Sequence, residues 1–217
     1  MRACSRTCGI LAVLGLLSTT ACLRKDLIHT LYISPTGVTW SAIEKDVRSD
    51  EEDPGNRLLE EQDYILGART GQHGVARALR AIGGTVDTTI LRRDRPFTVL
   101  TQAGFRDLAA VAAGIIKSSR VRGDTSIERD GCEKTFRAWL DLESHTGEDT
   151  DVSELIGQAT SYRLVLTEGR FLRAEGFTIE EEGAVAVPNV PVTLEDGTVR
   201  VSLTWKEDWC TPAAVSR

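Results

Sequence analysis

The three histidines are the side chains best suited to acid–base chemistry near neutral pH, and they lie far apart at His29, His73 and His145. His73 stands in a Gly-Gln-His-Gly segment, where an imidazole could be exposed and mobile; the simpler interpretation is a residue at a helix start that contacts solvent. His145 lies in a polar, acidic stretch at 144–153. That stretch is typical of a flexible surface loop, whereas a metal site needs rigid ligands. We therefore expect no metal site.

The motifs of several enzyme classes are absent from the sequence. It contains no Gly-x-Ser-x-Gly, no His-Glu-x-x-His, no Ser-x-x-Lys, no phosphate-binding loop and no dinucleotide-binding fingerprint. The acidic run at 50–53 lacks the spacing of a calcium loop and instead suits a helix start. We expect a protein that is not an enzyme and that needs no cofactor.

The first 21 residues have the layout of a secretory signal peptide. Arg2 and Arg6 give a positive start, and Gly9–Ala21 carries no charge. This run is shorter than the roughly 20 apolar residues of a membrane-spanning helix and suits the apolar part of a signal peptide. It ends in Thr-Thr-Ala followed at once by Cys22. Small residues directly before a cysteine resemble the lipobox of bacterial lipoproteins.

The resemblance implies a membrane anchor of palmitate-like acyl chains. In bacterial lipoproteins a diacylglyceryl group is attached to the cysteine thiol and the chain is cut just before it. Here that implies lipidation of Cys22 and cleavage after Ala21. Leu23, where inner-membrane lipoproteins often have Asp, favours the outer membrane facing the periplasm. We expect residues 22–26 to be a lipidated N-terminus and short tether, and 27–217 to be one domain.

The remaining thiols suggest a disulfide bond. Cys4 and Cys8 would leave with the signal, which leaves Cys132 and Cys210 in an oxidising compartment. We predict that these two are bonded; the alternative is a pair of buried free thiols. Closing a loop of about 80 residues would stabilise the fold by about 4 kcal/mol. A zinc site is not expected because the sequence has no Cys-x-x-Cys.

Composition excludes other classes of protein. Hydrophobic residues make up 41% of the chain and charged residues 27%, which is ordinary for a folded globular protein and unlike a disordered one. The formal net charge is -6, which argues against nucleic acid as a partner. The turn at Arg92, Arg93 and Arg95 is a possible anion patch, although a solvated turn is the simpler interpretation.

The mature part predicts an α+β fold with a mostly antiparallel, curved β-sheet built from hairpins and about three helices on one face. Alternating apolar residues predict two hairpins, at 27–42 and 86–103. Asp53 and Pro54 predict a helix start, and Leu58, Gln62, Ile65 and Leu66 keep helical spacing after it. Two shorter helices are expected near 75–82 and 108–115. Further strands are expected near 125–129, 134–142, 162–166, 172–179, 184–192 (an edge strand or an extended crossing) and 199–205.

These features favour a lipid-anchored binding or scaffolding domain of the bacterial cell envelope. Its partners would be the membrane, through the anchor, and an envelope protein or an apolar ligand. One alternative is a carrier of a lipid or other apolar ligand in a cavity between sheet and helices. The other is an envelope enzyme without a recognisable motif, which would need convergent polar groups in a cleft.

Overall fold

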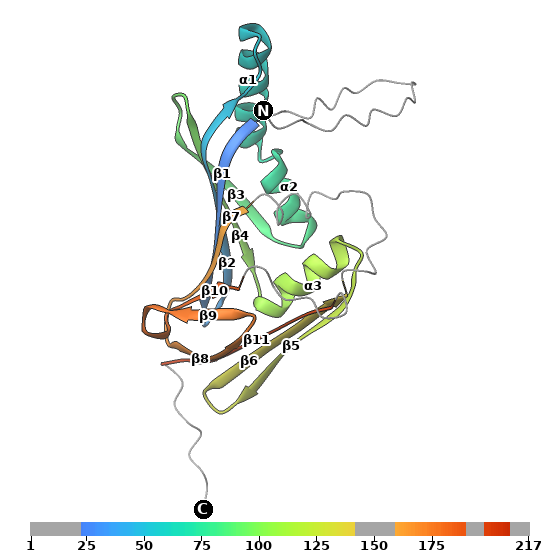
Figure 1. The fold of residues 1–217 in the computed structure, drawn as a ribbon, viewed down its shortest axis with the longest axis vertical. Helices are drawn as coiled ribbons and strands as arrows, with labels where there is room; N and C mark the ends of the chain where they lie inside the picture. The colour runs from blue at the N-terminus through green and yellow to red at the C-terminus, as the bar shows by residue number, and fades with distance from the viewer. Residues whose placement is uncertain (1–22, 142–158, 190–197, 209–217) are drawn as a thin grey trace, which may run out of the picture.

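The computed structural model describes residues 23–141, 159–189 and 198–208 (Figure 1). It has the predicted α+β class, with strands as the main component. The strands are β1 (Leu23–Ser34), β2 (Gly37–Ser49), β3 (Thr85–Arg92), β4 (Phe97–Phe105), β5 (Arg122–Asp130), β6 (Glu133–Asp141), β7 (Ala159–Leu166), β8 (Arg170–Glu175), β9 (Phe177–Glu180), β10 (Val185–Pro188) and β11 (Thr198–Lys206). The helices are α1 (Pro54–Thr70), α2 (Gly74–Ala81), α3 (Leu108–Ser118) and the short 3-10 turn η2 (Glu181–Gly183).

Both predicted hairpins are present and form one end of a seven-stranded sheet. Its strand order is β3-β4-β2-β1-β7-β10-β9. The alternation predicted for the first hairpin is confirmed. Its inner residues Leu27, Leu31, Ile33, Val38, Trp40 and Ala42 are all buried. The pairing of β1 with β7 is parallel. A sheet predicted from hairpins has antiparallel pairs, so this pairing is not predicted.

The sequence predicts one curved sheet, but the structure has two. The second sheet has the order β5-β6-β11-β8. The segment predicted as a single strand at 172–179 is divided at Gly176, so that β8 pairs with β11 in the second sheet and β9 pairs with β10 in the first. Gly176 has a φ of 78°, a conformation that residues with a side chain rarely adopt. This glycine lets the chain pass from one sheet to the other.

The prediction of an edge strand or extended crossing at 184–192 is wrong for its described part. β10 lies between β7 and β9 in the seven-stranded sheet, and β9 is the edge strand. The two proline signals do not conflict with this position, because Pro188 is the last residue of the short strand β10. Pro191 lies outside the described residues.

Helix caps follow the sequence. The Asp53 side chain accepts a hydrogen bond from the backbone N–H of Asn56, with Pro54 in the first helical position. Asp107 is the cap of α3, and its side chain accepts a hydrogen bond from the N–H of Ala110. Gly71 ends α1 in the left-handed conformation, and α2 begins three residues later.

The face of α1 that packs on the protein is not its leucine face. Its buried residues are Glu61, Tyr64 and Ala68. Leu58 and Leu66, which define the helical spacing in the sequence, are 51% and 59% exposed. The spacing therefore predicts the helix correctly but does not identify its buried side.

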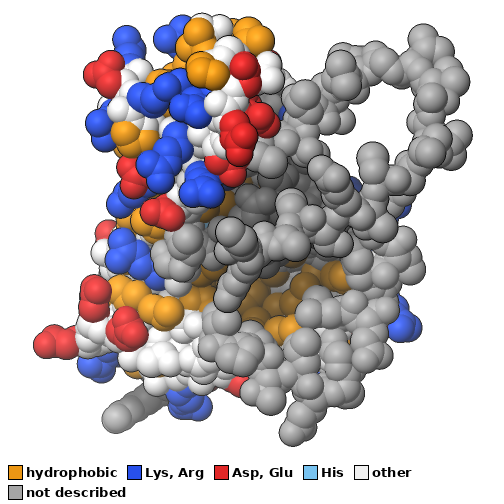
Figure 2. Space-filling model, turned by 45° about the horizontal axis from the view of Figure 1, so that its top comes forward, with side chains coloured by type: hydrophobic (Ala, Val, Ile, Leu, Met, Phe, Trp, Pro, Cys, Tyr) orange, Lys and Arg blue, Asp and Glu red, His pale blue; other side chains and the backbone are white. Residues whose placement is uncertain are grey.

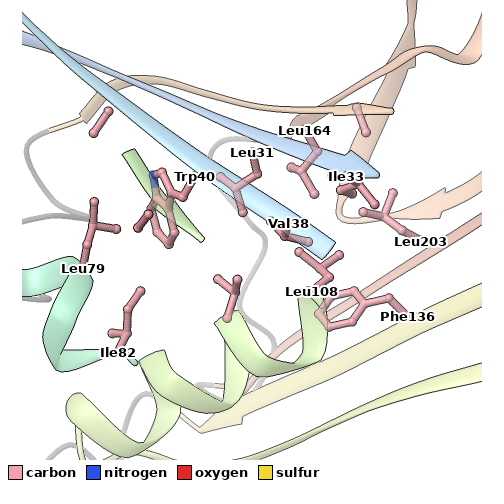
Figure 3. Close-up of a cluster of buried hydrophobic side chains, with 14 of the residues drawn as sticks. Leu31, Ile33, Val38, Trp40, Leu79, Ile82, Leu108, Phe136, Leu164 and Leu203 are labelled. Atoms are coloured by element: carbon pink, nitrogen blue, oxygen red, sulfur yellow. The ribbon is translucent and has the colours of Figure 1, made fainter. Parts of the chain in front are cut away.

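The main core lies where the two sheets meet α2 and α3. In Figure 3, Leu31 and Trp40 of the first sheet lie opposite Leu79 of α2, while Leu108 of α3 lies beside Phe136 of the second sheet. A smaller core under α1 comprises Val47, Tyr64, Ala68 and Val99. Leu23 packs against this smaller core. β1 thus begins one residue after Cys22, where the sequence analysis expects a short tether.

Candidate functional site

A buried polar cluster joins α2 to the first sheet. Lys25 Nζ donates a hydrogen bond to Glu44 Oε1 at 2.7 Å. Glu44 Oε2 lies 3.1 Å from His73 Nε2, which also lies 3.0 Å from Thr101 Oγ1. Glu44 comes from β2, Thr101 from β4, and His73 is the residue that caps α2. The cluster therefore fixes the start of α2 over the centre of the sheet.

The charge of Glu44 is held by its neighbours. Burial alone would raise the pKa of this carboxyl, but the hydrogen bond with His73 and the positive charge of Lys25 outweigh burial and lower the pKa to about 2. Tyr64 of α1 faces the same carboxylate, and burial together with the charge of Glu44 raises the pKa of its hydroxyl far above the usual range. Glu44 is consequently ionised and Tyr64 protonated at neutral pH.

A second buried group lies beside the first on the same face of the sheet. Trp40 Nε1 donates a hydrogen bond to His29 Nδ1 at 2.9 Å. The His29 ring stacks on Tyr162, with ring centroids 4.6 Å apart. Because Nδ1 accepts, the ring proton of a neutral His29 is on Nε2. The strand register places Thr101, Ala42, His29 and Tyr162 in one row across four strands.

The cluster is closed to substrates. His73 is only 6% exposed and Glu44 is fully buried, so the expectation that His73 contacts solvent is wrong. The helix start is confirmed, since His73 directly precedes α2. Sequence reasoning missed Glu44, although a signal exists: Trp40, Ala42 and Glu44 alternate, which places the carboxylate on the inner face of β2. A closed network of this kind stabilises and orients elements and gives no access to a reacting molecule.

The accessible feature lies at the end of the molecule where β1 begins. We call it the α1 pole and define it by Leu23, helix α1 and the turn 93–96 between β3 and β4. Leu58, Leu59 and Leu66 of α1 are between 51% and 60% exposed. Figure 2, which brings the top of Figure 1 forward, shows apolar side chains at this end beside both Lys or Arg and Asp or Glu side chains.

A groove of about 610 Å³ runs between α1 and the start of β4. Its apolar walls are Leu58, Ile65 and Leu66 of α1 and Phe97 of β4, and its charged walls are Glu61, Arg69 and Arg95. Both Ile65 and Phe97 also pack on the small core that Leu23 touches. The groove is therefore next to the point where the described chain starts.

The three arginines of the predicted anion patch have different surroundings. Arg95 binds Glu61, with its Nε 2.6 Å and a terminal nitrogen 2.5 Å from Glu61 Oε2. Glu61 is buried and also accepts from the backbone N–H of Ser49. Arg92 and Arg93 are exposed at the end of the hairpin. A solvated turn thus describes two of the three arginines, while the third partners a buried carboxylate.

Cys132 is buried in the turn between β5 and β6. Its carbonyl accepts a hydrogen bond from the N–H of Glu207, three residues before Cys210. Cys22, His145, Trp209 and Cys210 lie outside the described residues. Lipidation and the disulfide therefore stay predictions.

Across residues 23–141, 159–189 and 198–208, no helix has both the length and the apolar character needed to cross a membrane. The same ranges hold no group of three or more His, Cys, Asp or Glu side chains that could bind a metal ion.

The sequence matches no protein-family model and no curated protein. Among solved structures, the chain is similar to the folded domain of LppM from Mycobacterium tuberculosis, determined by NMR. The sequence identity is 17%, the TM-score is 0.39, and the match covers 90% of this chain and 96% of that domain.

Proposed function

We propose that the chain is a lipoprotein of the bacterial cell envelope, anchored through acyl chains on Cys22, and that its domain binds or scaffolds a partner without catalysis. The observation that carries this proposal is the Thr-Thr-Ala-Cys sequence directly before β1. Two or more acyl chains give a stable anchor, where a single chain binds a membrane only marginally.

The position of β1 gives the anchor a structural consequence. Because the strand begins at Leu23, the folded domain starts one residue from the modified cysteine. The anchor would then confine the domain at the membrane surface and raise its local concentration toward any membrane-bound partner. Leu23 directly after Cys22 supports the outer membrane, facing the periplasm, as the location.

The absence of catalysis is also part of the proposal. It is supported by the lack of catalytic motifs in the sequence and by the closed surroundings of Glu44 and His73, which leave no room for a substrate. A second candidate function is the carriage of an apolar ligand, which the groove between α1 and β4 favours. Its volume of about 610 Å³ falls in the range of small-molecule sites.

Metabolic labelling with radioactive palmitate tests the anchor. The wild-type chain should incorporate label and sediment with the envelope membranes, and Cys22→Ser should incorporate none. Cys8→Ser is the matched control, since it removes a thiol of the leader and should leave labelling unchanged. Equal labelling of wild type and Cys22→Ser would contradict the proposal.

A further inference from the structure

We propose that the α1 pole docks directly on a phospholipid bilayer containing anionic lipids, with the exposed leucines of α1 entering the apolar boundary and the arginines around the groove contacting lipid phosphates. This inference rests on the proposed anchor for the nearness of the bilayer. Its evidence comes from three properties of the pole: apolar exposure, charge and continuity with the start of the chain.

The apolar exposure is concentrated on one side of α1. At 100° per residue, Leu58, Leu59, Ile65 and Leu66 fall on one arc of the helix, beside the arc that Tyr64 and Ala68 bury. Three of the six large hydrophobic residues that are exposed in the described ranges belong to this arc: Leu58, Leu59 and Leu66. A solvent-facing leucine stripe on a surface helix is the feature that lets a helix lie in a membrane interface.

The charge around the groove favours lipid phosphates despite the acidic composition of the whole chain. Arg69 and Arg95 line the groove, and the one carboxylate among its walls, Glu61, is buried and bound by Arg95. Arg92 and Arg93 are exposed on the adjacent hairpin, where Asp94 is the one acidic residue among the three arginines. Arginine suits this role because its planar guanidinium binds phosphate oxygens in pairs.

Glu61 is the acidic residue of α1 that lines the groove, and the other two acids of the helix, Glu60 and Asp63, are not among its walls. Glu60 points toward Ser49, whose hydroxyl donates to it. Asp63 is offset along the helix by about 100° from the centre of the leucine arc. The leucine face is therefore bordered by arginine on the groove side.

The nearness of the α1 pole to the lipidation site favours a bilayer as the surface on which the pole docks. Leu23 packs on the small core beneath α1, together with Ile65 and Phe97 of the groove. The residue before Leu23 is Cys22, so a lipidated Cys22 would directly precede a residue that packs beneath α1. With no tether between anchor and domain, the α1 pole is the part of the molecule that a membrane meets first.

Vesicle sedimentation tests docking separately from lipidation. The protein is the chain from position 22 onward carrying Cys22→Ser, which cannot be acylated and retains every described residue. It should bind vesicles of phosphatidylcholine with phosphatidylglycerol more tightly than vesicles of phosphatidylcholine alone. Leu59→Gln/Leu66→Gln should weaken binding by about a hundredfold, since each leucine that enters the bilayer contributes at least about a factor of ten.

Two variants complete the design. Arg92→Gln/Arg93→Gln should weaken binding to the anionic vesicles and leave binding to neutral vesicles unchanged. Trp139→Gln is the matched control, because Trp139 is an exposed apolar residue of β6 in the other sheet, and binding should stay at the parent level.

Three results would overturn docking: no vesicle binding by the unacylated chain, equal binding by parent and leucine variant, or tight binding of monomeric palmitate that the leucine variant abolishes. The third result would assign the groove to a carried ligand. None of them affects the proposed anchor, which is tested separately by palmitate labelling of the wild type and Cys22→Ser.

Discussion

His73 Nε2 lies 3.1 Å from Glu44 Oε2, and this contact joins the start of α2 to the middle of β2 inside the protein. The two residues are distant in sequence and belong to different elements. His73 precedes helix α2, Glu44 belongs to strand β2, and Lys25 of β1 binds the same carboxylate. Removing one member of such a buried network leaves the others uncompensated, which costs more than the network contributes as a whole.

We predict that Glu44→Gln destabilises the fold by about 3 kcal/mol at pH 7, because Lys25 loses its buried counter-charge and His73 loses the carboxylate beside its ring. The effect should depend on pH. The pKa of Glu44 falls from 4.5 to about 2 on folding, so the charged carboxylate stabilises the fold above pH 4.5, and this contribution is lost as the pH falls toward 2. Urea unfolding of both proteins from pH 7 to pH 2 measures the difference.

The matched control for Glu44 is Asp26→Asn, which removes an exposed carboxylate from the neighbouring strand β1. It should change the free energy of unfolding by less than about 0.5 kcal/mol. A Glu44→Gln difference that stays constant down to pH 2 would contradict the role of the charged carboxylate.

Arg95→Ala should destabilise the protein by about 1 to 2 kcal/mol, because the buried carboxylate of Glu61 loses the guanidinium that pairs with it and, among the described residues, keeps the N–H of Ser49. Arg93→Ala, in the same turn, should be neutral, since its side chain is exposed. Thermal unfolding of the two variants separates the roles of these arginines. Equal melting temperatures would show that the pair with Glu61 contributes nothing.

The buried network shows what the sequence can and cannot predict. Alternation in β1 and β2 predicts their buried face, and Asp53 with Pro54 predicts the start of α1, because these signals are local. The burial of His73 depends on strands β2 and β4, which are distant in sequence, and no local pattern specifies it. The parallel pairing of β1 with β7 joins segments more than a hundred residues apart, and no local sequence pattern predicts it either.

The leucines of α1 show that a local pattern can predict an element without predicting how that element packs. Their spacing is that of an amphipathic helix, yet the helix packs through Tyr64 and Ala68 and leaves Leu58 and Leu66 exposed. Packing partners, not spacing, decide which side of a helix is buried. The exposed leucine face of the α1 pole therefore cannot be predicted from the sequence and is known only from the packing of the helix on the sheet.

Gly114→Ala should destabilise the protein by about 2 kcal/mol, although alanine favours helices. Gly114 lies inside α3, and a Cβ atom there would come 2.1 Å from the carbonyl oxygen of Ile82, just after α2. Gly74→Ala is the control, because a Cβ at that position meets nothing within 4 Å. Chemical unfolding compares the two; a stabilising Gly114→Ala would contradict the close contact between α2 and α3.

We expect Cys132 and Cys210 to form a disulfide bond in the exported protein. The N–H of Glu207 donates to the carbonyl of Cys132 at 3.3 Å, which brings the end of β11 beside the turn that holds the first thiol. Reduction should lower the free energy of unfolding by about 4 kcal/mol. Peptide mapping without reductant measures the bond, and alkylation of both thiols in the unreduced protein would exclude it.

Mass spectrometry of the mature amino terminus tests the central claim most directly. The lipid anchor predicts that the first residue of the protein recovered from envelope membranes is Cys22 and that its peptide carries a diacylglyceryl group. A mature protein that begins elsewhere, or that begins at an unmodified Cys22, would contradict the anchor.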